Sequence, residues 1–290
     1  MEAVIPRKRV LIIGSTGMLG HVLYNVLQNQ PDIELFDMSF RTKLTEKSII
    51  CDVTKIDILE EKIKEISPIV IINCVGILLK DSKINPANTI FINSYFPHKL
   101  RNIAIKVNAR VIQISTDCVF NGIKGLNSET ALPNASDIYG RSKSLGELNN
   151  NFDLTIRTSI IGPELKHNGE GLLHWLFNQN GNIYGFQNVF WSGVTSLELS
   201  KAILFSINHE INGLWNFTNG TQISKYDLIE KVINIFQLKN INLKQENQKS
   251  SNKTLISIRQ IEFKVNSYDK MIKDLKSFYE DNKHIYNYSI

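Results

Sequence analysis

Two patterns of apolar and polar positions alternate along the first half of the chain. Short runs of β-branched and other apolar residues predict strands, and longer segments with apolar residues at helical spacing predict helices. The expected strands cover 9–13, 33–36, 49–53, 69–75 and 109–114, and the expected helices cover 21–28, 55–66 and 93–106. The run at 69–75 is apolar on both faces, as a buried parallel strand requires. This alternation predicts an α/β fold with a doubly wound parallel sheet.

The pattern is looser after residue 143. One further strand is expected at 154–161, before Gly162 and Pro163, and the composition of 163–187 is typical of loops. A helix and a strand that rejoin the sheet are expected at 196–207 and 214–218. The segment 224–288 is expected to be helical, with a mobile Lys-, Asn- and Gln-rich loop at 238–253.

The composition excludes several classes of protein. Hydrophobic residues make up 42% and charged residues 21% of the 290 residues, so the chain can bury a core and is not globally disordered. The longest apolar stretch, 68–79, contains Asn73 and is shorter than the roughly 20 residues that span a bilayer, so no membrane span is expected. The first 14 residues lack the apolar region of a signal peptide.

Charge and cysteine content narrow the partners and the compartment. A net charge of +5, from 33 basic and 28 acidic residues, is too mild to predict binding of nucleic acid. The three cysteines, Cys51, Cys74 and Cys118, lack the spacing of a metal site, so no bound metal is expected. Their odd number and scattered positions favour the reducing cytoplasm.

A glycine-rich turn follows the first expected strand and opens a helix. It reads Gly14, Ser15, Thr16, Gly17, Met18, Leu19, Gly20. In such a turn the first glycine permits the tight bend, the second lets the backbone approach a pyrophosphate, and the third allows the helix to pack closely on the strand. Free N–H groups at the start of the helix then face the phosphates. We therefore expect a dinucleotide cofactor at this turn.

A second group of residues carries acid–base chemistry. Tyr139 and Lys143 lie four residues apart and share one face of an expected helix. A phenol with a pKa of about 10 exchanges protons poorly near neutral pH unless a neighbouring positive charge stabilises its anion. Thr116 ends an earlier strand, where its hydroxyl could bind the same carbonyl oxygen. This arrangement predicts reduction of a carbonyl or oxidation of an alcohol.

The order of these motifs resembles the extended short-chain dehydrogenase/reductase superfamily. The glycine turn, INCVG, ISTDCVF, YGRSK and IRTSIIGP follow one another, and STDCVF with YGRSK is most similar to the dTDP-4-dehydrorhamnose reductase family. The resemblance covers about residues 9–165. It implies a dinucleotide-binding Rossmann domain at 1–160, which segments near 190–220 rejoin. It also implies a smaller, discontinuous substrate-binding region, mainly 161–290.

The resemblance further implies roles for single residues and a reaction. Thr116, Tyr139 and Lys143 would be the catalytic triad, and Tyr139 and Lys143 would also contact the cofactor. The other implied cofactor contacts, besides the glycine turn, are Asp52, Val53, Cys74, Val75 and Gly76. The reaction would be NADPH-dependent reduction of the 4-keto group of a nucleotide-activated 6-deoxyhexose, in deoxysugar and cell-surface polysaccharide biosynthesis. The partner would be a nucleotide-diphosphate sugar, with a homodimer as a candidate assembly.

The chain departs from the family pattern in two places. The segment ILLKDSKINPAN after Gly76 lacks an acidic, His-containing stretch, and Lys80 within it is a candidate contact for the substrate diphosphate. Cys118 stands where related 4,6-dehydratases have glutamate, which disfavours elimination of water. Two alternatives stay open. The first is an epimerase or epimerase-reductase that uses Cys118 and His174 as acid and base. The second is a non-catalytic, NADP-binding regulatory subunit.

The choice of cofactor depends on the end of the second strand. An acidic residue there binds the ribose 2′-OH of NAD(H), and a basic residue accommodates the 2′-phosphate of NADP(H). The chain offers both Asp37 and Arg41; Arg41 and the resemblance favour NADP(H), with NAD(H) as the alternative. Among the aromatic residues, Trp191 is the candidate for substrate stacking, although core packing suits it equally.

Overall fold

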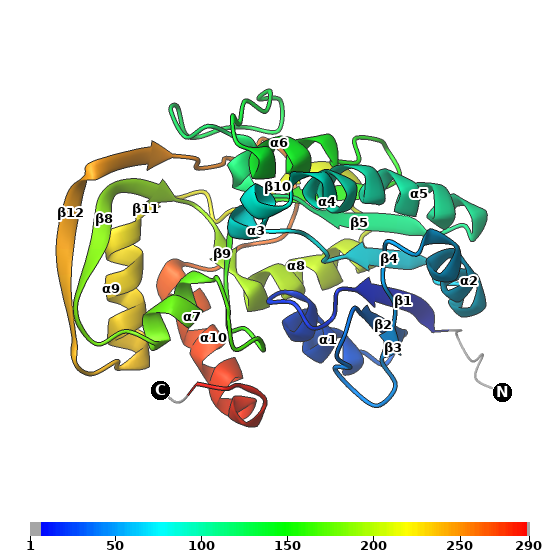
Figure 1. The fold of residues 1–290 in the computed structure, drawn as a ribbon, viewed down its shortest axis with the longest axis horizontal. Helices are drawn as coiled ribbons and strands as arrows, with labels where there is room; N and C mark the ends of the chain where they lie inside the picture. Colours follow the sequence, from blue (N-terminus) through cyan, green and yellow to red (C-terminus); the bar gives the residue numbers. More distant parts are fainter. Residues whose placement is uncertain (1–6, 289–290) are drawn as a thin grey trace.

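A parallel sheet of seven strands forms the centre of the molecule (Figure 1). The computed structural model describes residues 7–288. The strand order is β10-β6-β5-β4-β1-β2-β3, and all neighbours are parallel. The strands are β1 (Lys8–Ile13), β2 (Ile33–Ser39), β3 (Ile49–Ile50), β4 (Val70–Asn73), β5 (Arg110–Ile114), β6 (Leu154–Arg157) and β10 (Gly213–Asn216). This order is the doubly wound Rossmann arrangement that the alternation of patterns predicted.

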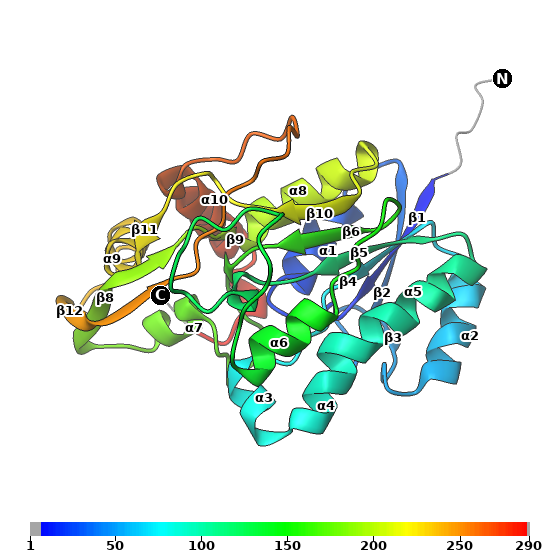
Figure 2. The ribbon, with the colours of Figure 1, turned by 90° about the horizontal axis from the view of Figure 1, so that it is seen from above.

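Helices cover both faces of this sheet, as Figure 2 shows. Side chains alternate along each strand, so Val10 and Ile12 of β1 enter one core and Leu11 and Ile13 enter the other. The first core also holds α1 (Gly20–Gln28), α8 (Ser196–Asn208) and α10 (Tyr268–Asp281). The second core holds α2 (Ile56–Ile66) and α5 (Phe96–Lys106). Burial on both sides explains why the central strands are continuously apolar.

A three-stranded sheet, ordered β11-β8-β12, lies beside the central one (Figure 1). Its strands are β8 (Gly181–Trp191), β11 (Ile223–Ser224) and β12 (Ile241–Asn252), and α9 (Lys225–Phe236) packs on β8. The expected mobile loop at 238–253 is therefore wrong, because most of it is β12, paired in parallel with β8. Ile241 and Leu243 are half-buried, whereas most of the polar side chains face solvent, so the segment reads as a loop when β8 is not considered.

Three other expectations differ from the structure. The strand expected at 154–161 is divided into β6 and β7 (Ile160–Ile161), and β7 pairs with β9 (Val194–Thr195). The expected loop region at 163–187 contains α7 (Leu172–Phe177) and more than half of β8. The helix expected at 93–106 begins earlier, with a π-helical turn. The remaining helices are α3 (Leu79–Ile84), α4 (Pro86–Ile90), the π-helical turn Phe91–Tyr95, α6 (Ile138–Leu145), and the 3₁₀ turns Asp117–Val119 and Lys283–Ile285.

Within residues 7–288, no helix is both long and apolar enough to cross a membrane.

Candidate active site

The glycine turn joins β1 to α1 with little space around two of its glycines. Gly14 has a φ of +90°, and a Cβ atom there would lie 3.1 Å from the carbonyl carbon of Cys74. A Cβ atom on Gly20 would overlap the carbonyl oxygen of Gly14. A Cβ atom on Gly17 would meet only that same oxygen, at 3.3 Å, so its outer side is open. This open backbone fits the close approach of a cofactor pyrophosphate.

The other residues of the turn divide between core and surface. Ser15 and Leu19 are buried, whereas Thr16 and Met18 are half-buried beside Gly17. The structure therefore leaves the stretch from Thr16 to Met18 accessible to a ligand.

The imidazole of His21, in the first turn of α1, forms a hydrogen bond with the backbone of the glycine turn. A carbonyl oxygen can only accept, so Nδ1 of His21 donates to Gly17 O at 2.7 Å, and Nε2 accepts from the Tyr286 hydroxyl at 3.0 Å. Burial lowers the pKa of His21 to about 4, and the bond to Gly17 opposes this shift. A neutral imidazole therefore connects the turn to the C-terminal segment. No sequence pattern pointed to this residue, because its partner is distant in the chain.

The two residues that bear on cofactor choice have different surroundings. Asp37 lies inside β2, is 3% exposed, and accepts hydrogen bonds from Ser15 Oγ at 2.5 Å and Ser48 Oγ at 3.0 Å. Arg41 lies beyond the strand end, is exposed, and places its guanidinium 4.6 Å from the centre of the Phe40 ring. The charged group that is free to meet a ligand at this strand end is therefore Arg41.

The other residues expected to contact the cofactor lie in the segments that follow β3 and β4. The Asp52 carboxylate accepts from the backbone N–H and hydroxyl of Thr54, and Val53 is buried. Cys74 N donates to Ile13 O at 2.9 Å, and burial raises the pKa of the Cys74 thiol to about 12. Val75 N donates to Asn73 Oδ1 at 3.1 Å.

Gly76, the last of these residues, lies next to Lys143. A Cβ atom on Gly76 would be 3.7 Å from Lys143 Nζ. Gly76 is exposed, so this position is open to a ligand that also reaches Lys143.

Thr116 follows β5 and caps the 3₁₀ turn Asp117–Val119. Its hydroxyl accepts from Cys118 N at 3.1 Å and donates to Asp117 Oδ1 at 3.2 Å. A Cβ atom on Gly140 would overlap the carbonyl oxygen of Cys118, so only glycine lets α6 lie this close to the turn. The chain thus places the Thr116 hydroxyl against the helix that carries Tyr139 and Lys143.

Tyr139 and Lys143 project from α6, whose N-terminus is capped by the Asp137 carboxylate bound to Gly140 N at 2.9 Å. Burial raises the pKa of Tyr139 above its ordinary value, and the Thr116 hydroxyl opposes the shift. Lys143 is 7% exposed, and its Nζ donates to Ile114 O at 2.6 Å. Burial lowers the pKa of Lys143 to about 8, while the Glu147 carboxylate opposes that change. A protonated phenol thus lies one helical turn from an ammonium group.

Comparison with known proteins places this arrangement in a family. The sequence model described as the RmlD substrate binding domain matches residues 8–257. The chain belongs to this family. Its members include dTDP-4-dehydrorhamnose reductases of the extended short-chain dehydrogenase/reductase superfamily, as the motifs suggested.

Individual relatives are distant in sequence. The chain is 26% identical over 259 residues to methionine adenosyltransferase 2 subunit beta of Bos taurus, an alignment that covers 84% of this chain and 76% of that one. It is 30% identical over 141 residues to dTDP-4-dehydrorhamnose reductase of Aggregatibacter actinomycetemcomitans, covering 48% and 45% of the two chains.

Solved structures share the fold over nearly the whole chain. The dTDP-4-dehydrorhamnose reductase of Bacillus anthracis in complex with NADP has a TM-score of 0.79 at 22% identity, covering 94% of this chain and 99% of that one. A hypothetical dTDP-4-dehydrorhamnose reductase from Sulfolobus tokodaii has a TM-score of 0.76 at 25% identity, with coverages of 90% and 98%.

Two polar networks near the expected catalytic residues of this RmlD-family chain were not predicted from the sequence. Asn93, in the π-helical turn, accepts from Ile77 N and donates to Ile77 O, both at 2.9 Å, and donates to Ser142 Oγ at 3.2 Å. π-Helical turns are often found at functional sites. This π-helical turn shifts the register of the helix by one residue without changing its composition, so the spacing of apolar residues in 91–106 could not reveal it.

The second network is a buried ion pair below Lys143. Arg157, at the end of β6, donates two hydrogen bonds to Glu147, at 2.7 and 2.6 Å, and Ser115 Oγ donates to the same carboxylate at 2.7 Å. Arg157 therefore forms a buried ion pair at the end of the sheet, and only the tertiary structure reveals Glu147 as its partner.

The three expected substrate contacts lie in different environments. Lys80 is exposed in the first turn of α3. Cys118 is half-buried beside Asp117, and burial raises the pKa of its thiol to about 12. Trp191 is 2% exposed and packs in the core with its ring centre 5.7 Å from that of Tyr268. The expected stacking of Trp191 on a substrate is therefore wrong, because its ring is already covered.

His174, the expected partner of Cys118, lies on α7 with its ring edge against Tyr288, at 5.4 Å between centres. Its neighbours also include Gly169. Those of Cys118 are Thr116 and the charged groups of Asp117 and Lys253. In the part of the chain described here, no hydrogen bond connects the two side chains.

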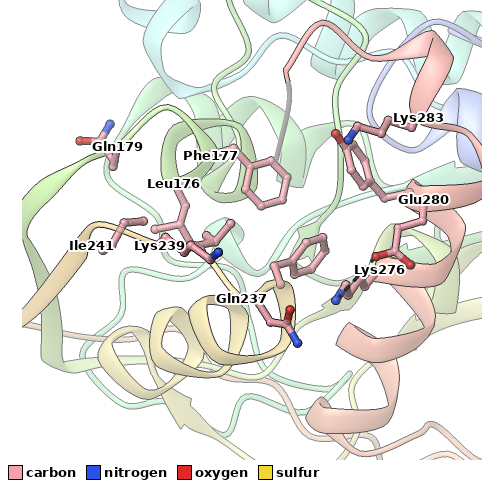
Figure 3. Close-up of a pocket in the computed structure, with 12 residues that line it drawn as sticks. Leu176, Phe177, Gln179, Gln237, Lys239, Ile241, Lys276, Glu280 and Lys283 are labelled. Atoms are coloured by element: carbon pink, nitrogen blue, oxygen red, sulfur yellow. Dashed lines mark ion pairs between the residues drawn. The ribbon is translucent and has the colours of Figure 1, made fainter.

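A cavity of about 520 Å³ lies elsewhere, between α7, the end of α9 and α10 (Figure 3). Its lining includes Phe177, Gln237, Lys239, Lys276 and Lys283. The lining contains neither the glycine turn nor Thr116, Tyr139 and Lys143, so the cavity is separate from the candidate active site.

Among residues 7–288, no three His, Cys, Asp or Glu side chains gather in a way that could hold a metal ion.

Proposed function

We propose that the chain is an NADPH-dependent reductase of the 4-keto group of a nucleotide-activated 6-deoxyhexose. The observation that carries this proposal is the arrangement of Thr116, Tyr139 and Lys143, with Lys143 Nζ bonded to Ile114 O and close to Gly76. Membership of the RmlD family and the fold shared with dTDP-4-dehydrorhamnose reductases support the substrate class. Such a reduction belongs to deoxysugar synthesis for cell-surface polysaccharides.

Each residue has a chemical task in this reaction. A bound dihydronicotinamide supplies the hydride that reduces the keto carbon. The Thr116 hydroxyl orients the carbonyl oxygen, and Tyr139 transfers its phenolic proton to that oxygen as negative charge develops. Because burial raises the pKa of Tyr139, the phenol carries its proton at neutral pH. The Lys143 ammonium then stabilises the phenolate that remains.

The preference for NADP(H) rests on Arg41. Its guanidinium is exposed at the end of β2, where it can pair with a 2′-phosphate. Asp37, which would favour NAD(H), is held by Ser15 and Ser48 in the core. NADP(H) is therefore the cofactor that we propose.

The test combines the protein and NADPH with dTDP-, UDP- and GDP-linked 4-keto-6-deoxyhexoses, and it follows NADPH oxidation and the products. We expect one nucleotide series to be reduced by the wild type and not by Tyr139→Phe. Tyr184→Phe, at an exposed tyrosine of β8, is the matched control. NADPH binding without reduction of any sugar would contradict the proposal.

The second candidate is a non-catalytic subunit. It is favoured by the similarity, over 84% of the chain, to a protein named as a subunit of methionine adenosyltransferase 2. NADPH binding without turnover in the same assay would support this alternative.

A further inference from the structure

Two lysines without an ion-pair partner lie near the 3₁₀ turn Asp117–Val119, which follows Thr116. Lys225 is the first residue of α9, and Lys253 immediately follows β12. Both side chains are half-buried. Within residues 7–288, neither ammonium group lies within 4.0 Å of a carboxylate oxygen, whereas other half-buried lysines, such as Lys62 and Lys231, do.

The position of Lys253 is set by the loop that follows the 3₁₀ turn Asp117–Val119. Asn252 N donates to Gly122 O at 2.6 Å, and Asn127 N donates to Thr254 O at 2.9 Å, so the residues on both sides of Lys253 are held by this loop. A Cβ atom on Gly122 would lie 3.2 Å from Lys253 Cγ. The stem of Lys253 therefore packs against Gly122, five residues beyond Asp117.

The position of Lys225 is set by α9 and the core. Ser224 caps the helix by accepting from Asp227 N at 3.0 Å, which fixes the backbone beside Lys225. The Lys225 ammonium lies 5.1 Å from the centre of the Trp191 ring, a favourable cation–π distance. Trp191, whose expected role in stacking on a substrate is wrong, thus positions a lysine.

Both ammonium groups lie close enough to Asp117 to affect the pKa of its carboxyl group. Burial raises the pKa of Asp117, and the nearby positive charges of Lys225 and Lys253 both oppose this shift. Burial lowers the pKa of Lys225, and the charge of Asp117 opposes that shift. Burial raises the pKa of the Cys118 thiol, and the positive charge of Lys253 opposes that rise. The two ammonium groups and the Asp117 carboxylate therefore act on one another electrostatically near Thr116, without forming an ion pair. Their sum is one positive charge, held in a site with little solvent.

We propose that Lys225 and Lys253 bind the diphosphate of the nucleotide sugar. This inference rests on the proposed function and assigns residues to the substrate side of the same site. In a 4-keto sugar, the diphosphate and the ketone lie on opposite sides of one hexose ring. A diphosphate bound by the two ammonium groups would therefore lie one hexose ring away from a ketone bound by Thr116 and Tyr139. Lys80, the residue that the sequence suggested, is exposed on α3 and has no such confinement.

The test measures binding by calorimetry in the full-length, NADPH-loaded protein. The probes are dTDP, UDP and GDP, each compared with its nucleoside, which lacks the diphosphate. We expect one diphosphate to bind more tightly than its nucleoside, and Lys225→Met and Lys253→Met each to weaken its binding about 10- to 100-fold, the usual effect of losing a charged hydrogen bond. Nucleoside and NADPH affinities should be unchanged.

Lys249→Met is the matched control. Lys249 lies on β12 with its ammonium 4.6 Å from the centre of the Phe186 ring, which repeats the lysine–aromatic contact away from Asp117. This variant should bind every probe as the wild type does. If Lys225→Met fails to fold, as judged by loss of the NADPH-dependent rise in melting temperature, the result for Lys253→Met decides.

The outcomes separate this inference from the proposed function. Wild-type affinity for the diphosphate in both lysine variants would overturn the inference, as would a wild type that binds no diphosphate more tightly than its nucleoside. Loss of diphosphate binding in the variants, with no reduction of any keto sugar by the wild type, would support the lysine site and contradict the reductase. If both variants still reduced the keto sugar with an unchanged KM, the result would support the reductase and contradict the lysine site.

Discussion

Lys143 Nζ donates a hydrogen bond to the main-chain carbonyl of Ile114, at 2.6 Å. Ile114 is the last residue of β5, two residues before Thr116, and Lys143 is on α6, one turn after Tyr139. This single bond therefore links the helix that carries Tyr139 and Lys143 to the strand that precedes Thr116. It also holds the Lys143 ammonium in a buried position, where desolvation lowers the pKa of this group to about 8.

The first prediction concerns the proton donor. Tyr139→Phe should lower turnover by about 100- to 10,000-fold, the usual contribution of a positioned general acid. NADPH affinity should change little, because the phenol acts mainly on the substrate oxygen. Steady-state kinetics and cofactor titration measure the two effects. Near-wild-type turnover, with the chemical step shown to be rate-limiting, would remove Tyr139 from its role.

The second prediction separates Lys143 from Tyr139. Lys143→Met should reduce both turnover and NADPH affinity, the latter by about 10- to 100-fold. Because burial lowers the pKa of Lys143 to about 8, the ammonium loses its proton as the pH rises through that value. NADPH affinity of the wild type should therefore decline above about pH 8, and Lys143→Met should lack this decline.

The pH dependence has a matched control. Lys239→Met, at the cavity of Figure 3, should keep the wild-type pH profile of NADPH binding. The same profile in Lys143→Met and the wild type would contradict the role of the Lys143 ammonium.

The third prediction concerns cofactor preference. Arg41→Ala should weaken NADPH binding by at least about 10-fold and leave NADH binding nearly unchanged, because only NADPH carries the 2′-phosphate. Lys43→Ala is a control nearby, since the Lys43 ammonium is bound to Glu46 O at 3.1 Å. If Arg41→Ala preserved the ratio of the two affinities, another group would have to read the phosphate.

The fourth prediction separates reduction from epimerisation. Reduction changes only the ketone carbon, so in deuterated water no deuterium should enter the flanking carbons above the spontaneous rate. An epimerase must remove and replace a proton there. Mass spectrometry of the recovered sugar measures the incorporation. Catalysed exchange that disappears in Cys118→Ser or His174→Asn would favour the epimerase alternative.

The fifth prediction concerns stability in acid. His21 has a folded-state pKa of about 4 against an ordinary value of 6.5, so the unfolded chain binds more protons between these values. The free energy of unfolding should therefore fall as the pH drops from 6.5 towards 4, by up to about 3 kcal/mol. Denaturant unfolding across this range should show a shallower fall for His21→Gln.

His209→Gln is the control for this measurement. His209 also bonds a carbonyl four residues earlier, Phe205 O at 2.9 Å, but it is exposed. Its variant should keep the wild-type slope. Equal slopes in His21→Gln and the wild type would show that His21 does not control the acid limb.

Local sequence determined the central sheet and the motifs at its strand ends. The strand, turn and helix around Gly14–Gly20 are adjacent in the chain, so the apolar run and the glycine spacing suffice to predict them. The same holds for Tyr139 and Lys143, because helical geometry alone places residues four apart on one face. The class of fold, a doubly wound parallel sheet, followed from the alternation with helices, which permits few parallel topologies.

Tertiary contacts decided what happens to residues whose partners are far away in the chain. β12 is a strand because β8 supplies its hydrogen bonds, although its polar side chains resemble a loop. Asp37 is held in the core by hydrogen bonds from Ser15 and Ser48, and Trp191 is covered by Tyr268. The charges of Lys225 and Lys253 act on Asp117 only after three distant segments have folded together. Periodicity describes the faces of single elements, whereas burial and charge neighbours depend on how those elements pack.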